Sequence, residues 1–293
     1  MARKGHRVKD VTGLQNCMFD LKPKRSQAEV FMSADIDVTE FVKYIKKMKE
    51  TNKDLTYFHG FVHIMGKLIY EFPRLNRFVQ NRILFEHDNV EIAFVAKAEF
   101  NDKSEEFLTC LPVEPEDTVL DVSKRIKEKI DKIRDKNSTI NTEGANNIVD
   151  KIGMSWKPFR MFCVGILKWI DRVFGWPAAI ANENIYYSSL IVSNLGTYRV
   201  PGIYHNLADL GTSSGLVAFG DIKEDNGKYT MNIGATLDER IADGFYFCKA
   251  LKGIEYLFAN PELMMKPAGE RFEMPDNVRK KTDDKKVEKK AKK

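Results

Sequence analysis

The octapeptide Leu237-Asp238-Glu239-Arg240-Ile241-Ala242-Asp243-Gly244 decides how this chain is interpreted. It follows residues 229–237, which have the apolar character of a strand. It precedes residues 244–259, which form a helical pattern that stops before Pro261. The sequence therefore predicts a charged loop that joins a strand to a helix.

A second segment, residues 186–222, supports the first. It contains Ser193-Asn194-Leu195-Gly196, followed by a loop and by an apolar strand that reaches Gly220. Weaker support comes from residues 32–98, where Asp37-Val38-Thr39 opens one helix and residues 71–76 close another. The order of these segments along the chain is stronger evidence than any single segment, because short patterns of common residues recur by chance.

Together the segments resemble the catalytic domain of the dihydrolipoamide acyltransferases of 2-oxoacid dehydrogenase complexes, whose pattern is Asp-His-Arg-x-x-Asp-Gly. They also resemble the chloramphenicol acetyltransferases, whose pattern is His-x-x-x-Asp-Gly. The resemblance covers roughly residues 7–260, and Glu239 stands where these families place the catalytic histidine. It implies an α/β fold of the chloramphenicol-acetyltransferase type, a two-layer sandwich in which helices flank a mixed sheet. It also implies coenzyme A-dependent acyl transfer.

The resemblance also assigns roles to residues. In these families the histidine takes the proton of the thiol of coenzyme A or dihydrolipoamide, and a serine donates a hydrogen bond to the tetrahedral intermediate. Carried over, the roles make Glu239 the base and Ser193 the oxyanion donor, with a catalytic-loop role for Asp243. The remaining matched residues are expected to shape the site: Asp238, Arg240, Gly244 and Asn194.

Replacing the histidine by glutamate leaves two functions open. A thiol with a pKa of about 8.5 needs a base within hydrogen-bond reach, and an exposed carboxylate is a weaker base than histidine by about two units. Burial in an apolar pocket makes a carboxyl a better base, whereas Arg240 and nearby dipoles would hold Glu239 ionised. The chain is therefore either an acyltransferase with an altered base or a catalytically inactive trimeric scaffold or regulatory relative.

His205, in the loop 201–206, is the other candidate for proton transfer, with a plain surface histidine as its alternative. In the chloramphenicol acetyltransferases the signature aspartate pairs with an N-terminal arginine, a position for which Arg7 and Arg25 are candidates here. His59 and His63 lie one helical turn apart without the carboxylate of a metal motif, so they predict helix packing. No metal site is expected.

Charge is concentrated at one end of the chain. Residues 277–293 hold nine Lys or Arg and three acidic residues, which leaves 38 basic and 39 acidic residues elsewhere. The near-neutral body argues against a nucleic-acid-binding protein, and the Lys-rich tail predicts disorder. The four cysteines form no C-x-x-C pair, and no apolar stretch follows the basic start, so a cytoplasmic protein is expected.

The expected architecture is one acyltransferase-like domain over residues 1–276, with an inserted segment at about 137–185. Hydrophobic periodicity predicts strands and helices in alternation. Strands are expected over 29–36, 90–98, 107–113, 186–195, 215–222 and 229–237, and helices from 39, from 56 to the Pro73 stop, over 118–136 and over 244–259.

The inserted segment carries all three tryptophans, Trp156, Trp169 and Trp176. Phe159 and Phe162 begin an apolar helical face that continues to residue 174, and basic residues occupy much of the other face. The segment is too short and too charged to span a bilayer, which needs about 20 apolar residues. Core packing, a pocket wall or a subunit contact is the favoured interpretation, and a membrane-interface helix is the alternative.

The families that the chain resembles also suggest its partners. Their active site forms between subunits, so the chain is expected to be a homotrimer with acyl-coenzyme A as substrate. No lipoyl domain precedes the predicted domain, so a stand-alone protein is expected, with any lipoyl- or acyl-carrying protein supplied in trans.

Overall fold

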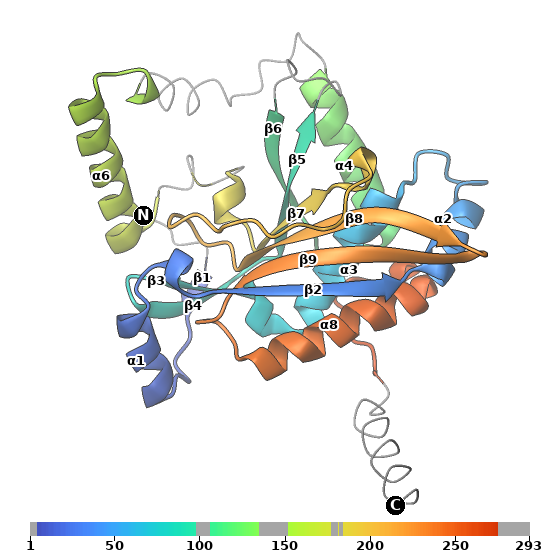
Figure 1. The fold of residues 1–293 in the computed structure, drawn as a ribbon, viewed down its shortest axis with the longest axis horizontal. Helices are drawn as coiled ribbons and strands as arrows, with labels where there is room; N and C mark the ends of the chain where they lie inside the picture. The colour runs from blue at the N-terminus through green and yellow to red at the C-terminus, as the bar shows by residue number, and fades with distance from the viewer. Residues whose placement is uncertain (1–4, 98–105, 135–151, 177–180, 182–183, 275–293) are drawn as a thin grey trace, which may run out of the picture.

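A six-stranded mixed sheet organises the molecule (Figure 1). Its strands, in spatial order, are β2 (Glu29–Asp37), β9 (Lys228–Asp238), β8 (Gly215–Asp225), β7 (Leu190–Asn194), β5 (Glu91–Lys97) and β6 (Glu106–Pro112). β7 pairs in parallel with both β5 and β8, and the other neighbours are antiparallel. The computed structural model describes residues 5–97, 106–134, 152–176, 181 and 184–274.

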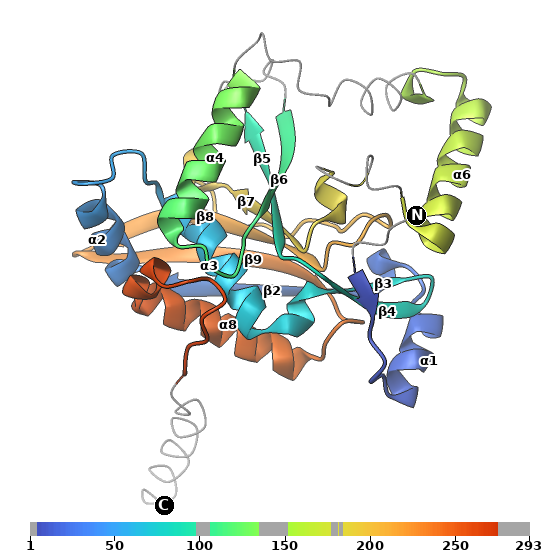
Figure 2. The same cartoon turned by 180° about the vertical axis from the view of Figure 1, so that it is seen from behind.

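Helices cover one face of this sheet, as the view from behind shows (Figure 2). They are α2 (Thr39–Met48), α3 (Tyr57–Glu71), α4 (Val119–Arg134) and α8 (Gly244–Ala259). The main core lies between these helices and the sheet, because alternate strand residues point to the same face. At its centre Phe61 of α3 stacks on Phe219 of β8 with ring centroids 4.4 Å apart. The predicted two-layer α/β sandwich is confirmed.

Local sequence signals set the ends of these helices. Thr56 caps α3 by accepting a hydrogen bond from the backbone N–H of His59, as predicted. Pro73 then begins the short 3-10 helix η2 (Pro73–Asn76) and ends α3. His59 and His63 are buried and pack against other elements. His59 contacts Ser123 of α4, and His63 contacts the carbonyl of Asp117.

The loop of residues 199–214, which precedes β8, has no regular structure and lies against the other face of the sheet. Gly202 contacts the strands so closely that a Cβ atom there would lie 2.4 Å from the backbone nitrogen of Gly234. Beyond it, Tyr204 packs on Phe31 of β2 with ring centroids 5.3 Å apart. The loop therefore follows β8 and β9 toward the end of β9, where the signature octapeptide begins.

The remaining elements were harder to predict. A small sheet of β1 (Gly5–Arg7), β4 (Ile83–His87) and β3 (Arg77–Gln80) and the helix α1 (Gly13–Leu21) had no predicted counterpart. The strand expected over 186–195 is shorter, because residues 185–187 form the 3-10 helix η3 (Ile185–Tyr187) before β7 begins. The Lys-rich tail and residues 137–151 of the insert lie outside the described residues.

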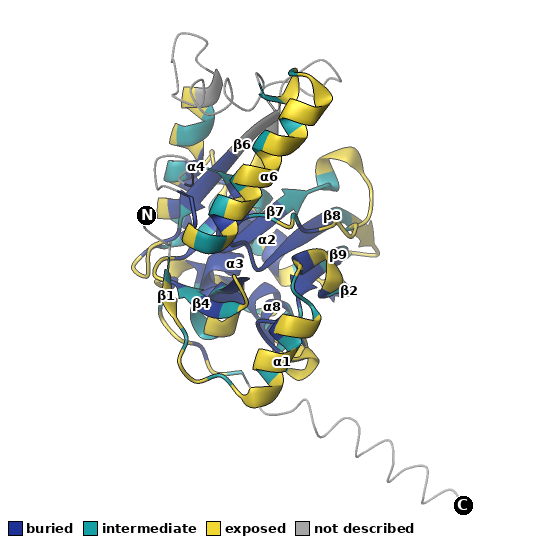
Figure 3. Ribbon diagram, turned by 90° about the vertical axis from the view of Figure 1, so that its left-hand side faces the viewer, coloured by how far each residue is buried: buried dark blue, intermediate teal, exposed yellow. Residues whose placement is uncertain are grey.

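The tryptophan-containing segment forms helix α6 (Lys157–Phe174). It lies at the edge of the molecule (Figure 1), and most of its length is exposed (Figure 3). Phe159, Phe162, Ile166 and Trp169 are exposed in the single chain. Leu167 and Ile170 instead pack against the small buried cluster of Trp176, Ala181 and Tyr187. None of the helices in the described part of the chain is long and apolar enough to cross a membrane.

Candidate active site

Two buried side chains fix the conformation of the loop after β9. Asp238 accepts hydrogen bonds at Oδ1 from the backbone N–H and Nε of Arg240, at 3.1 and 2.8 Å, and at Oδ2 from Nη2 at 2.7 Å. Both side chains are almost fully buried. Arg240 also donates to the carbonyls of Lys22 and Pro23, each at 3.2 Å. Charge-assisted pairs of this kind are strong and directional, so the loop is held in one position.

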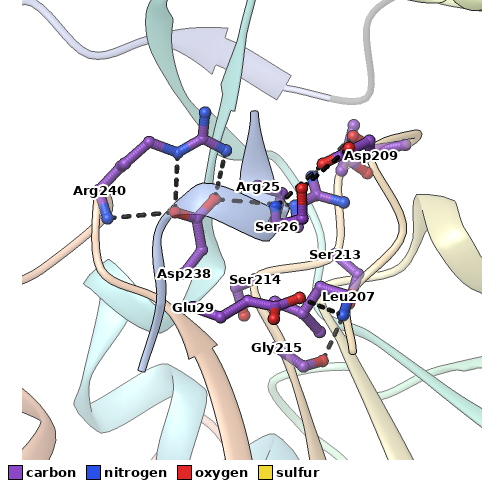
Figure 4. Close-up of polar contacts among 12 residues, drawn as sticks. Arg25, Ser26, Glu29, Leu207, Asp209, Ser213, Ser214, Gly215, Asp238 and Arg240 are labelled. Atoms are coloured by element: carbon purple, nitrogen blue, oxygen red, sulfur yellow. Dashed lines mark hydrogen bonds and ion pairs between the residues drawn. The ribbon is translucent and has the colours of Figure 1, made fainter. Parts of the chain in front are cut away.

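A second buried arginine connects this loop to the loop before β8 (Figure 4). Arg25 lies with its Nε 3.7 Å from Oδ2 of Asp238, and its Nη atoms donate to three backbone carbonyls within 3.0 Å. These carbonyls belong to Ala208, Leu210 and Gly211. Burial lowers the pKa of Arg25, and the carboxylate of Asp238 opposes that shift.

Further hydrogen bonds tie residues 24–29 to the same loop. Ser26 donates to Asp209 from its backbone N–H and its hydroxyl, at 2.9 and 3.0 Å. Glu29 accepts from the backbone N–H of Leu207 at 2.6 Å, and Asp238 donates its N–H to the carbonyl of Ser214. Three segments that lie far apart in sequence thus meet in one polar network (Figure 4).

The side chain of Glu239, which lies between Asp238 and Arg240 in sequence, is not part of their buried ion pair. Its backbone N–H donates to Ala28, while its carboxylate accepts a hydrogen bond from Nζ of Lys22 at 2.6 Å. The side chains of Glu239 and Lys22 are 39% and 35% exposed. The carboxylate is therefore presented at the surface beside a positive charge, and not in an apolar pocket.

Asp243 and Gly244 form the start of α8. Oδ1 of Asp243 accepts a hydrogen bond from the backbone N–H of Tyr246 at 2.8 Å, which caps the helix. The candidate arginine Arg25 pairs with Asp238 and not with Asp243, and Arg7 lies on β1. Asp243 thus acts on the loop through the helix that it caps.

Ser193 and Glu239 do not meet within one chain. Ser193 pairs in register with Ala218 of β8, which pairs with Gly234 of β9. Glu239 follows Gly234 by five residues. With about 3.4 Å per strand residue and about 4.8 Å between strands, the two side chains are on the order of 20 Å apart. Asn194, beside Ser193, accepts a hydrogen bond from the N–H of Gly196 and shapes the turn after β7.

His205 lies closer to the signature loop. Its backbone N–H donates to Oγ1 of Thr236 at 3.2 Å, and its exposed ring contacts the carbonyl of Asn206 through Nδ1. Thr236 precedes Glu239 by three residues, or about 10 Å along a strand. The backbone of His205 therefore lies near the end of β9, and its ring contacts Asn206 rather than Glu239.

A cavity of about 40 Å³ lies in the core between the sheet and α8. Its lining is almost wholly apolar and includes Met32, Leu237 and Leu251, but not Ser193, His205 or Glu239. Binding sites for small molecules usually measure about 300–1,000 Å³. This cavity is too small for an acyl chain with its carrier.

Comparison with solved structures identifies the fold. A probable dihydrolipoamide acetyltransferase from Listeria monocytogenes 4b F2365 has a TM-score of 0.56 and 16% identity, with 87% of this chain and 95% of that chain covered. The cubic core of a pyruvate dehydrogenase multienzyme complex has a TM-score of 0.56 and 13% identity, covering 88% and 93%. A chloramphenicol acetyltransferase has 0.55 and 11%, covering 87% and 99%.

This chain therefore has the fold shared by dihydrolipoamide acetyltransferase cores and chloramphenicol acetyltransferase, as the resemblance implied. By sequence, no protein-family model and no curated protein matches it. A further structural neighbour is the Azotobacter vinelandii dihydrolipoamide acetyltransferase, studied for the role of a serine, a histidine and an asparagine in its catalytic mechanism.

Sequence reasoning missed several residues of the network. No sequence signal marks Lys22, because nothing near it in sequence shows that the end of α1 meets the loop after β9. Glu29 and Asp209 were missed for the same reason, since both act on a loop about 180 residues away. The sequence makes Arg25 a candidate partner of the signature aspartate, but it carries no signal that this partner is Asp238.

Proposed function

We propose that this chain is a coenzyme A-dependent acyltransferase that works as a homotrimer, with each active site between two subunits. One observation carries the proposal most: buried Asp238 and Arg240 lock both sides of Glu239 and present its carboxylate at the surface. A loop held this rigidly around one projecting side chain fits a preorganised site. The fold shared with acetyltransferase structures supports the same function.

The distance between Ser193 and Glu239 supports a site between subunits. Side chains on the order of 20 Å apart cannot act on one thioester, whereas a neighbouring chain can place its Glu239 near Ser193. Apolar side chains on the sheet face opposite the helices offer a contact surface for such a neighbour. Those exposed on or over this face include Phe31, Val95, Ile203 and Tyr204.

In the proposed reaction, the carboxylate of Glu239 accepts the proton of the attacking thiol. The thiolate adds to the acyl carbonyl, and the hydroxyl of Ser193 donates a hydrogen bond to the resulting oxyanion. Collapse of this intermediate expels the leaving thiolate, which takes the proton back from Glu239. His205 is the second candidate for this proton transfer, because its backbone binds Thr236 near the end of β9, and Asp243 and Gly244 hold the loop through α8. Lys22 keeps the Glu239 carboxylate oriented through its 2.6 Å hydrogen bond.

A second function has its own support. Lys22 partly neutralises the partly exposed carboxylate of Glu239. Glu239 therefore also has the environment of an ordinary surface ion pair, which needs no role as a base. That arrangement suits a trimeric scaffold or regulatory relative that has lost acyl transfer. An acyl-carrying or lipoyl-carrying protein acting in trans is a partner for either function.

A thiol-release assay with acetyl- and long-chain acyl-coenzyme A separates the two functions. For the enzyme, we expect turnover by the wild type, loss of it in Glu239→Gln, and retention in Glu40→Gln. Glu40 is a matched control, since it also pairs with a lysine, Lys43, at 2.9 Å on an exposed surface. Glu239→His returns a base of pKa near 6.5 and should raise turnover. Absence of turnover in every variant, with no coenzyme A binding by calorimetry, would overturn the enzyme proposal.

A further inference from the structure

Helix α6 exposes a continuous apolar stripe. Phe159, Phe162, Ile166 and Trp169 follow each other at spacings of three, four and three, so they lie along one side of the helix. Between 41% and 65% of each of these residues is exposed. Isolated apolar residues on a surface are ordinary, but an aligned row of large apolar residues indicates an interaction site.

The stripe is exposed although α6 is attached to the body of the protein. Asp171 of α6 is buried and accepts hydrogen bonds from the Tyr187 hydroxyl at 2.6 Å and the Gly211 N–H at 3.2 Å. The side chain of Gln80 donates to the carbonyl of Asp171 at 2.6 Å, and Trp176 donates to the carbonyl of Leu167. One side of α6 is thus anchored to the body, and the apolar stripe faces away from it.

The charges of α6 indicate what covers the stripe. The helix carries four basic residues: Lys157, Arg160, Lys168 and Arg172. Its one acidic residue, Asp171, is buried and already accepts hydrogen bonds there. On a helical wheel Lys157 and Lys168 lie on the side opposite the apolar stripe, and Arg172 lies beside it, about 60° from Trp169. Helices that combine Trp and Phe with a basic face bind membrane interfaces rich in anionic lipids.

We propose that α6 docks in the interface of a membrane that contains anionic lipids. The apolar stripe enters the headgroup region, and the positive charge of the polar face attracts the anionic surface. Asp171 and Arg25 hold the same loop, at Gly211, so docking would place the candidate active site near the lipid surface.

The test is cosedimentation of the full chain with vesicles of phosphatidylcholine alone or with phosphatidylglycerol, with tryptophan emission recorded in parallel. We expect binding and a blue shift only with the anionic vesicles. Phe162→Ser with Trp169→Ser should weaken the partition coefficient on the order of 100-fold, as two apolar side chains lose their burial. Lys168→Gln with Arg172→Gln should weaken it about 30-fold, as two positive charges are removed.

Leu14→Ser is the matched control, because Leu14 is an exposed apolar residue of another helix, α1. Circular dichroism and urea unfolding check that each variant is folded. The proposal is overturned if the anionic vesicles do not bind, if neutral vesicles bind equally, or if Leu14→Ser weakens binding as much as the stripe variant. It is also overturned if the stripe variant lowers the oligomer mass by sedimentation equilibrium without changing vesicle binding. None of these measurements depends on acyl transfer.

Discussion

The substitution Asp238→Asn tests whether the polar network holds the signature loop. Asp238 is 1% exposed and is the carboxylate that faces both Arg240 and Arg25. Without its charge, two guanidinium groups remain in the interior and lose their common counter-ion. Breaking a buried ion pair from one side costs about 3–5 kcal/mol, so we expect the free energy of unfolding to fall by about 4 kcal/mol.

Urea unfolding at a fixed protein concentration, followed by circular dichroism, measures this effect. With a slope of about 3 kcal/mol per molar urea, a loss of 4 kcal/mol lowers the midpoint by roughly 1.3 M. Asp37→Asn is the control, because Asp37 forms an exposed ion pair with Lys228 at 3.4 Å. We expect that control to change the free energy of unfolding by less than about 1 kcal/mol. Equal, small losses in both variants would refute the proposed role of the network.

Three further predictions concern stability. Burial lowers the pKa values of His59 and His63 to about 4. Below pH 6.5 the unfolded state therefore binds protons that the folded state excludes. The contribution of these histidines to the free energy of unfolding is complete above pH 6.5 and should fall by about 2 kcal/mol per histidine at pH 5. Equal urea midpoints at pH 7 and pH 5 would contradict this. Gly202→Ala brings a Cβ within 2.4 Å of the Gly234 nitrogen and should lower the melting temperature by several degrees, whereas Gly13→Ala, with open space around it, should not. Phe219→Ala removes a fully buried ring that stacks on Phe61. Urea unfolding should show that the free energy of unfolding falls by about 3–5 kcal/mol. A fall below about 1 kcal/mol would mean that this ring is not central to the core.

Much of the sheet and of the helices packed on it could be predicted because those elements carry strong periodic patterns. The strand β2, the capped helix α3 and the helix α8 after Asp243 were placed within a residue or two. The small sheet was missed because β1 and β3 span only three and four residues, too few to show alternation.

The candidate site was predicted in part. The signature loop was identified because its charged residues are adjacent in sequence, and Asp243 at the start of α8 follows the capping rule. Lys22 and Arg25 reach the loop only through the fold, with partners more than 180 residues away. The separation of Ser193 from Glu239 likewise depends on strand register, which a single sequence does not specify.

The central claim, an acyl-transfer site shared between subunits, is tested most directly by mixing two inactive variants. Ser193→Ala and Glu239→Gln are each expected to abolish turnover alone. Refolded together in equal amounts into mixed trimers, they should regain about a quarter of the wild-type thiol-release rate, because one interface in four then joins an intact Ser193 to an intact Glu239. Mixed trimers that form but show no activity, beside an active wild type, would contradict the account.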